Sequence, residues 1–207
     1  MRLKLSFSAV FVTILFLVFM TSVPGSLPAA IFLDISASDS RTYPELESRK
    51  DQYISGSISF GIFDHIRIGY THLRGFSYKE GYRTGTDSAT GTEFYYRFKD
   101  NTQTISSSVD LTLILYNGMI SPFIFGGLVW KDYYTTVEYP STIYKAHTKF
   151  YKVPNYGCGL SIFLDDNFRL KITQTFTPGE KRQLKDGVET KEDILETYTQ
   201  VGISYRL

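Results

Sequence analysis

The chain has 207 residues, of which 43% are hydrophobic and 21% charged, and its formal net charge is +1. That length leaves room for one domain, and the composition lies far from that of disordered chains. A balanced charge with scattered basic residues argues against a nucleic-acid partner. The chain contains 16 Tyr, 16 Phe and 16 Gly, which favours an all-β protein because aromatic side chains suit pleated surfaces and Gly suits turns.

The N-terminus has the layout of a secretory signal peptide. Arg2 and Lys4 precede an apolar run that extends to Met20, and small and turn-forming residues follow it. A transmembrane anchor is the alternative, but a run of about 16 residues is shorter than the roughly 20 that cross a bilayer as a helix. We therefore expect residues 1–25 to be a signal peptide, cleaved between positions 25 and 30, and residues 26–207 to form one exported domain.

Alternation of polar and apolar residues predicts eight strands, each long enough to cross a membrane at a tilt. In the fourth of them, Val109 and Leu111 fall on one face, whereas Ser108 and Asp110 fall on the other. Alternation does not say which face points inward, because a soluble sandwich alternates too. The predicted strands are 29–38, 52–63, 65–78, 102–116, 119–134, 151–164, 168–177 and 194–207.

The predicted connections alternate between short and long. In an up-and-down meander this places every short turn at one end, as in outer-membrane barrels with short periplasmic turns and long outer loops. We therefore expect residues 26–207 to form one outer-membrane β-barrel domain, an eight-stranded antiparallel up-and-down transmembrane β-barrel. The short connections are residue 64, residues 117–118 and residues 165–167, and the long ones are 39–51, 79–101, 135–150 and 178–193.

The last eight residues resemble the C-terminal β-signal by which the barrel assembly machinery recognises outer-membrane barrels. That signal reads polar, any, Gly, any, any, aromatic, any, hydrophobic, and its specified positions are filled by Gln200, Gly202, Tyr205 and Leu207. Bacterial examples usually end in Phe, so Leu207 is a departure.

With its export signal, eight strands and four long loops, the chain resembles the eight-stranded bacterial outer-membrane barrels of the OmpA transmembrane-domain and OmpW type. The resemblance covers the mature chain and is architectural. It implies a place in the outer membrane, among lipid and lipopolysaccharide, and a role in envelope integrity, adhesion, surface recognition or passage of small solutes.

If the apolar faces meet lipid, the interior receives a set of charged side chains together with many Ser and Thr. An eight-stranded barrel is only wide enough for its side chains to fill, so we expect these groups to form a hydrogen-bonded plug. The alternative is a narrow pore in which ion pairs exchange partners. The predicted lumen network is Asp34, Arg67, Asp110, Arg169, Lys171, Glu196 and Arg206.

Aromatic residues near both ends of the predicted strands are candidates for the two interfacial girdles of a membrane barrel. The candidates near the short turns and the C-terminus are Phe63, Tyr116, Phe163, Phe168 and Tyr205, and those toward the other rim are Trp130, Tyr133 and Tyr134.

We expect no catalytic, cofactor or metal site. An acyl-transfer site built on His72 would need a serine such as Ser77 or Ser106 and an acid such as Asp100, and nothing in the sequence selects them. The long loops are rich in Tyr and mixed charge, which favours an extracellular protein or glycan partner. We therefore expect a structural or surface-interaction protein. A narrow pore is the alternative, followed by an exported lipocalin-like binder of an apolar ligand or a lipid-modifying envelope enzyme.

Overall fold

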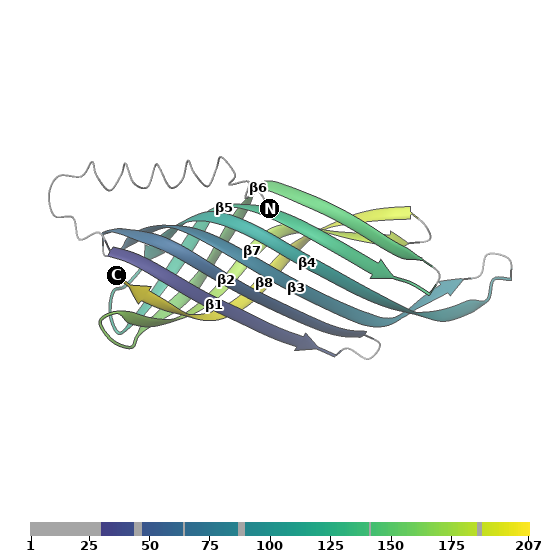
Figure 1. Cartoon of the computed structure of the whole chain (residues 1–207), viewed down its shortest axis with the longest axis horizontal. Coiled ribbons are helices and arrows are strands. Elements are labelled where there is room, and N and C mark those ends of the chain that lie inside the picture. The colour runs from purple at the N-terminus through teal and green to yellow at the C-terminus, as the bar shows by residue number, and fades with distance from the viewer. Residues whose placement is uncertain (1–29, 44–46, 64, 87–89, 141, 186–187) are drawn as a thin grey trace, which may run out of the picture.

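The computed structural model describes residues 30–43, 47–63, 65–86, 90–140, 142–185 and 188–207, and the predicted signal peptide lies outside them. Eight antiparallel strands follow one another around a closed barrel, in which β1 pairs with β8 (Figure 1). The predicted fold class is therefore confirmed. No helix among the described residues is long and apolar enough to cross a membrane. The strands are β1 Ala30–Thr42, β2 Glu47–Phe63, β3 Ile66–Thr86, β4 Glu93–Ile114, β5 Ile120–Glu138, β6 Ile143–Phe163, β7 Phe168–Lys185 and β8 Val188–Arg206.

The alternation of the sequence becomes the two faces of the barrel wall. In β4, Ser108 and Asp110 point inward and are 5% and 9% exposed, whereas Val109 and Leu111 point outward and are 38% and 54% exposed. Successive side chains of a strand point to opposite sides, so one regular pattern supplies both faces. The interior of this barrel is polar and its outer surface is apolar.

The four connections predicted as long loops are mostly strand, which corrects that prediction. β3 and β4 continue beyond the rest of the barrel as a two-stranded ribbon, with Thr86 opposite Glu93 (Figure 1). Polar contacts support this part of the wall, such as the ion pair of Lys79 with Glu47 at 2.6 Å. Neither face of the outer half is apolar, so the alternation that marks a strand is missing there. The loops that remain are 43–46, 87–92, 139–142 and 186–187.

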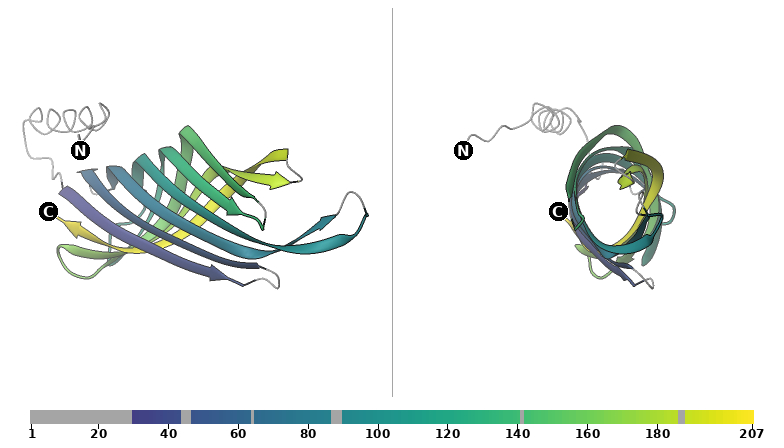
Figure 2. Two further views of the ribbon diagram at one scale, coloured as in Figure 1. Left: turned by 45° about the vertical axis from the view of Figure 1, so that its right-hand side comes forward. Right: turned by 90° about the vertical axis from the view of Figure 1, so that its right-hand side faces the viewer.

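Two of the eight ladders stop short. The β6–β7 ladder ends at the pair Tyr156 and Phe176, and the β1–β8 ladder ends at the pair Ala37 and Val201. Beyond these points, within the described structure, residues 177–185 of β7 and 188–196 of β8 pair only with each other. Residues 197–200 of β8 pair with residues 173–176 of β7, which also pair with β6. We call residues 177–185 and 188–196 the β7–β8 arm. Figure 2, in its right-hand view along the barrel, shows the yellow end of the arm inside the outline of the ring.

Two neighbouring glycines of β5 give a prediction about the packing of the wall. A Cβ added at Gly127 would lie 2.0 Å from the carbonyl oxygen of Val109, whereas one added at Gly126 would lie 4.0 Å from its nearest neighbour. We expect Gly127→Ala to lower the free energy of unfolding by roughly 1–3 kcal/mol through overpacking. Gly126→Ala should change it by less than about 0.5 kcal/mol. Urea unfolding in lipid vesicles, followed by Trp130 fluorescence, measures both, and equal effects would contradict the assigned close approach.

Candidate functional site

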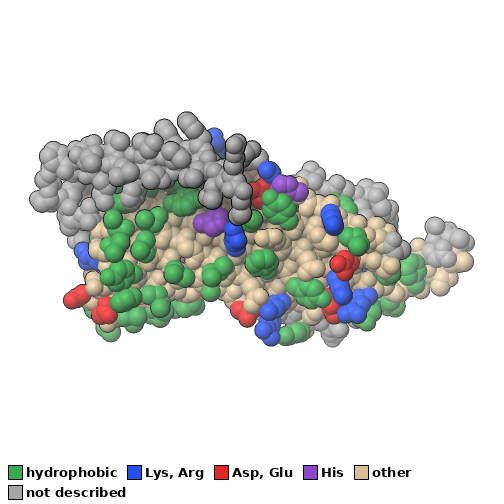
Figure 3. Space-filling model, in the orientation of Figure 1, with side chains coloured by type: hydrophobic (Ala, Val, Ile, Leu, Met, Phe, Trp, Pro, Cys, Tyr) green, Lys and Arg blue, Asp and Glu red, His purple; other side chains and the backbone are tan. Residues whose placement is uncertain are grey.

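Large apolar side chains cover the outside of the barrel at the short-turn end. Figure 3 shows them in green over the left half of the molecule, while most of the charged side chains in view lie further to the right. A soluble barrel that holds an apolar ligand would turn such side chains inward. An exposed apolar belt of this extent needs an apolar surrounding. Its members include Leu33, Ile35, Ile54, Ile58, Ile68, Val109, Leu111, Leu113, Ile124, Leu128, Leu160, Val201 and Ile203.

Aromatic rings border this belt. Phe168 and Tyr205 lie at the short-turn end with their ring centroids 4.9 Å apart. Tyr156 and Phe176 stack at 5.8 Å where the β6–β7 ladder ends. Of the other girdle candidates near the short turns, Tyr116 and Phe163 are exposed, and the side chain of Phe63 lies outside the described structure.

Two girdle candidates on β5 point in different directions. Trp130 is half-buried on the outward-facing side of the strand. Tyr133 instead points into the barrel, where its side chain is 7% exposed and its hydroxyl donates to the Glu196 carboxylate at 2.7 Å. Its assignment as an interfacial aromatic is therefore wrong. Tyr133 and Tyr134 are adjacent, and only one of two adjacent strand residues can face outward, so the exposed Tyr134 occupies that position.

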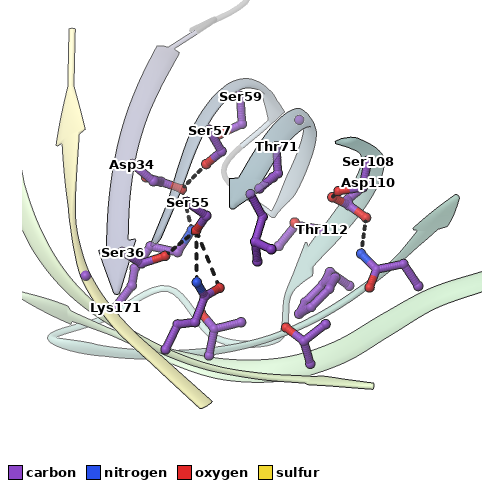
Figure 4. Close-up of a pocket in the computed structure, with 18 of the residues that line it drawn as sticks. Asp34, Ser36, Ser55, Ser57, Ser59, Thr71, Ser108, Asp110, Thr112 and Lys171 are labelled. Atoms are coloured by element: carbon purple, nitrogen blue, oxygen red, sulfur yellow. Dashed lines mark hydrogen bonds and ion pairs between the residues drawn. The ribbon is translucent and has the colours of Figure 1, made fainter. Parts of the chain in front are cut away.

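The acidic and lysine side chains of the interior contact partners from other strands. Lys171 of β7 lies 2.5 Å from the Asp34 carboxylate of β1, and Ser57 of β2 donates to the same oxygen at 3.1 Å (Figure 4). Close by, Gln200 donates to the Ser55 hydroxyl at 3.1 Å. Buried charges need such partners, because the desolvated groups would otherwise be strongly destabilising. This cluster ties β1, β2, β7 and β8 together.

A second cluster lies on the other side of the interior. Asn155 of β6 donates to Asp110 of β4 at 2.8 Å, and Ser108 donates to the other carboxylate oxygen at 2.6 Å (Figure 4). Thr177 of β7 in turn donates to the Asn155 side-chain oxygen at 2.9 Å. The sequence predicted Asp110 in the lumen but missed Asn155. A count of strand parity from the adjacent apolar Tyr156 would have placed Asn155 inside.

The third cluster lies nearer the outer rim. Lys131 of β5 is 4% exposed, and its ammonium group lies 2.7 Å from the Glu196 carboxylate of β8, which also accepts the Tyr133 hydroxyl. The sequence predicted Glu196 in the lumen, whereas its partner Lys131 was missed. Lys131 lies two residues after the buried Val129, so strand parity was the signal that places it inside.

The three predicted lumen arginines lie toward the short-turn end. Arg67 is 8% exposed, and its guanidinium carbon lies 3.6 Å from the centroid of the Phe32 ring. Arg206 is paired with Phe32 in the β1–β8 ladder and is exposed, while Arg169 lies 6.0 Å from the ring of Phe163. Among the described residues, none of the three arginines forms an ion pair. The interior is therefore most basic at this end.

The remaining space inside the barrel is a polar cavity of about 110 Å³. All eight strands contribute to its lining, which includes Asp34, Lys171 and Asp110 and many Ser and Thr hydroxyls. A cavity needs about 10–15 Å³ of such space to hold one water, so this one has room for several waters among polar partners. We therefore expect a hydrated interior.

The β-signal residues belong to the strand that closes the barrel. A Cβ added at Gly202 would lie 2.3 Å from the carbonyl oxygen of Ile35 in β1, so only Gly permits this approach of the two strands. The Leu207 side chain is exposed. The backbone N–H of Leu207 donates to the carbonyl oxygen of Ile31 at 2.9 Å. The C-terminal octet therefore lies at the β1–β8 closure.

The histidine considered for catalysis lies on the outside of the wall. His72 Nδ1 lies 3.1 Å from the Ser107 hydroxyl, which also accepts a hydrogen bond from Tyr70 at 3.0 Å. Neither serine proposed from the sequence fills this place, and Ser106 points into the lumen. We find no carboxylate in hydrogen-bond contact with His72 among the described residues. Nor do those residues include a group of three or more His, Cys, Asp or Glu that could hold a metal ion.

The β3–β4 ribbon carries aromatic and charged side chains on its surface. Tyr82, Phe94 and Tyr95 are 54%, 48% and 70% exposed. The Tyr78 hydroxyl and the Arg97 guanidinium both bond to the Glu80 carboxylate, and these contacts lower the pKa of that carboxyl below its ordinary value. The surface combines rigid rings with fixed charges, a composition found in binding surfaces.

The sequence matches no family model and no curated protein. Solved structures with a similar fold include the N-terminal β-barrel domain of Pseudomonas aeruginosa OprF, at 13% identity and a TM-score of 0.43, covering 86% of this chain and 97% of that one. A major outer membrane protein from Thermus thermophilus is 11% identical with a TM-score of 0.49, covering 87% and 100%. Ail, the attachment invasion locus protein of Yersinia pestis, solved with the heparin analogue sucrose octasulfate, is 12% identical with a TM-score of 0.48, covering 87% and 100%.

The interior ion pair gives a prediction about stability. Lys171→Met would leave the Asp34 carboxylate, which is 9% exposed, without its cation. We expect a loss of roughly 3–5 kcal/mol in the free energy of unfolding, partly restored by adding Asp34→Asn. Lys149→Met is the control, because Lys149 is 48% exposed and 3.9 Å from its acid, so the loss should stay below about 1 kcal/mol. Urea unfolding in vesicles tests this, and similar losses for both lysines would contradict it.

Proposed function

We propose that this chain is a bacterial outer-membrane barrel that presents its long hairpins at the cell surface for structural or recognition roles. The observation that carries the proposal is the reversal of polarity, in which Leu111 and Ile203 are more than half exposed while Asp34 and Lys131 are buried. Such a surface is stable only against an apolar medium, and a closed β-barrel is the all-strand structure that satisfies its backbone there.

The proposed orientation places the short turns in the periplasm and the β3–β4 ribbon outside the cell. Lipid contacts the apolar belt, and lipopolysaccharide contacts the wall above it. The exposed rings of Tyr82, Phe94 and Tyr95 support a protein or glycan partner for the ribbon, because aromatic side chains with few rotamers make favourable contact surfaces. No catalytic role is proposed.

The orientation can be tested with single cysteines at the two ends, in a Cys158→Ser background. Thr92→Cys lies beside the tip of the β3–β4 ribbon, and Asp166→Cys lies in the short β6–β7 turn, where both positions are exposed. We expect a large membrane-impermeant maleimide to label position 92 on intact cells and position 166 only after permeabilisation. The reverse pattern would overturn the orientation, and labelling of neither after permeabilisation would exclude the assigned exposure.

The barrel assembly machinery is the proposed partner during insertion, through Gln200, Gly202, Tyr205 and Leu207. Tyr205→Ala should lower the amount of folded barrel in the outer membrane several-fold. Phe168→Ala is the matched control, because it removes the same ring contact at 4.9 Å without changing the octet. Quantitative immunoblots of outer-membrane fractions measure both. Equal losses would show that the ring contact matters and would count against recognition of the octet.

A narrow pore is the second candidate function. The polar cavity of about 110 Å³ favours it, since water can occupy the middle of the barrel. This candidate needs an entrance to the cavity.

A further inference from the structure

Two prolines, Pro154 and Pro178, lie just beyond the pair at which the β6–β7 ladder ends. The Phe163 N–H bonds to Met119 on the β5 side, and the Leu164 N–H bonds to the carbonyl of Phe168 at the start of β7. The backbone N–H and C=O groups of successive residues in a strand point alternately to its two neighbours. The even-numbered residues of β6 from Pro154 to Ile162 therefore direct these groups toward β7, and the even-numbered residues of β7 direct theirs toward β6. By the same register, in which Tyr156 pairs with Phe176, Pro154 would pair with Pro178.

This pair would be one in which each residue donates its N–H to the other. Proline has no N–H, so both donors of the pair are missing at the same place. One proline interrupts a ladder, but two opposed prolines remove the whole hydrogen-bonded pair. The opening between β6 and β7 is therefore a consequence of the sequence at Pro154 and Pro178.

The β7–β8 arm also leaves its other neighbour. The β1–β8 ladder ends at the pair Ala37 and Val201, so within the described structure both edges of the arm are unpaired. Such a ribbon can move as a unit about its base, because its only ladder is internal. The arm leans inward (Figure 2). Just below it, the Tyr198 ring of β8 stacks on Tyr53 of β2 with the ring centroids 5.2 Å apart.

One ionic contact fixes the arm to the opposite wall. Glu196 of the arm accepts hydrogen bonds from Lys131 and Tyr133 of β5, each at 2.7 Å. Lys131 is 4% exposed, so its charge depends on Glu196 while the arm is in place. If the arm moved outward, both charges would regain water. The contact acts together with the hydrogen bond from Thr177, at the base of the arm, to Asn155 of β6.

The arm adjoins the polar cavity on its outer side. Tyr198 and Gln200 of β8, just below the arm, are part of the cavity lining, and so are their β7 partners Thr175 and Thr173. We propose that the β7–β8 arm is a lid, latched by Glu196 on Lys131 and Tyr133, that admits small hydrophilic solutes and ions from the outer side to the cavity. This proposal rests on the proposed membrane insertion and goes beyond it, because it assigns the entrance and its control.

Access to the cavity can be measured with a thiol probe that does not require passage through the whole barrel. Thr173→Cys in the Cys158→Ser background places a thiol in the cavity lining. The probe is a small charged methanethiosulfonate, and the readout is its rate of reaction in detergent micelles. Any route from the short-turn end contributes equally to all variants, so a difference between variants reports the lid.

Three variants of this probe protein should move the rate in different directions. Glu196→Gln removes the charged partner of the latch, and we expect the reaction to become about tenfold faster. Pro154→Val with Pro178→Val restores both missing donors, and we expect the reaction to become slower because the ladder can extend. Asp132→Asn is the control, because Asp132 lies on the outside of β5 beside the latch, and its rate should equal that of the parent.

The heat-dependent mobility of each variant on a detergent gel establishes that it is folded, which separates a failed lid from a failed barrel. If Glu196→Gln does not fold, Lys131→Met removes the other half of the latch and should give the same acceleration. Equal rates in the parent, the latch variant and the proline variant would overturn the proposal. So would acceleration by Asp132→Asn to the same extent as by the latch variant.

Discussion

The need to satisfy every backbone N–H and C=O within the wall governs this structure. In an apolar surrounding there is no water to bond an unpaired peptide group, so strands must pair on both edges and the sheet must close. How complete the ladders are depends on the position along the barrel axis. They are complete around the apolar belt, including the β1–β8 closure from Phe32 to Ala37, and they stop only where the outer surface becomes polar. The free edges of the β7–β8 arm lie in the part of the molecule where water can replace the missing bonds.

The same strand geometry supplies the interior. Each residue that faces outward is followed by one that faces inward, so an apolar belt is accompanied by a lumen of hydroxyls and charges. Buried carboxylates in a narrow lumen need partners, and Asp34, Asp110 and Glu196 each find one on another strand. These contacts cross the barrel and leave between them a cavity with room for water. Interior polarity, stability and the proposed entrance are therefore consequences of one pattern.

The sequence predicted the parts of the fold that hydrophobicity marks. Alternation located all eight strands across the belt and placed Asp34, Asp110 and Lys171 inside, because the lipid-facing side must be apolar. It did not predict the outer halves of the strands. In the segment from Lys79 to Asn101 neither face needs to be apolar. The sequence of a ribbon stabilised by cross-strand polar contacts therefore has the same polar composition as that of a loop.

Other features depended on pairing, which one strand alone does not contain. Lys131 and Asn155 follow from strand parity, but their partners Glu196 and Asp110 lie on other strands. Tyr133 was misplaced because its position near the rim was considered without its parity. The effect of Pro154 and Pro178 on the ladder could not be predicted without the β6–β7 register, which places them opposite each other when it is extended beyond Tyr156 and Phe176.

The most direct measurement of the central claim is the location and heat-dependent mobility of the full-length chain in a Gram-negative host. A folded barrel with this apolar belt should fractionate with the outer membrane. On a detergent gel its band should move between unheated and boiled samples, because the closed ladder resists detergent until heated. A soluble periplasmic protein whose mobility does not change on boiling would contradict the account, since the belt would then have no apolar surrounding.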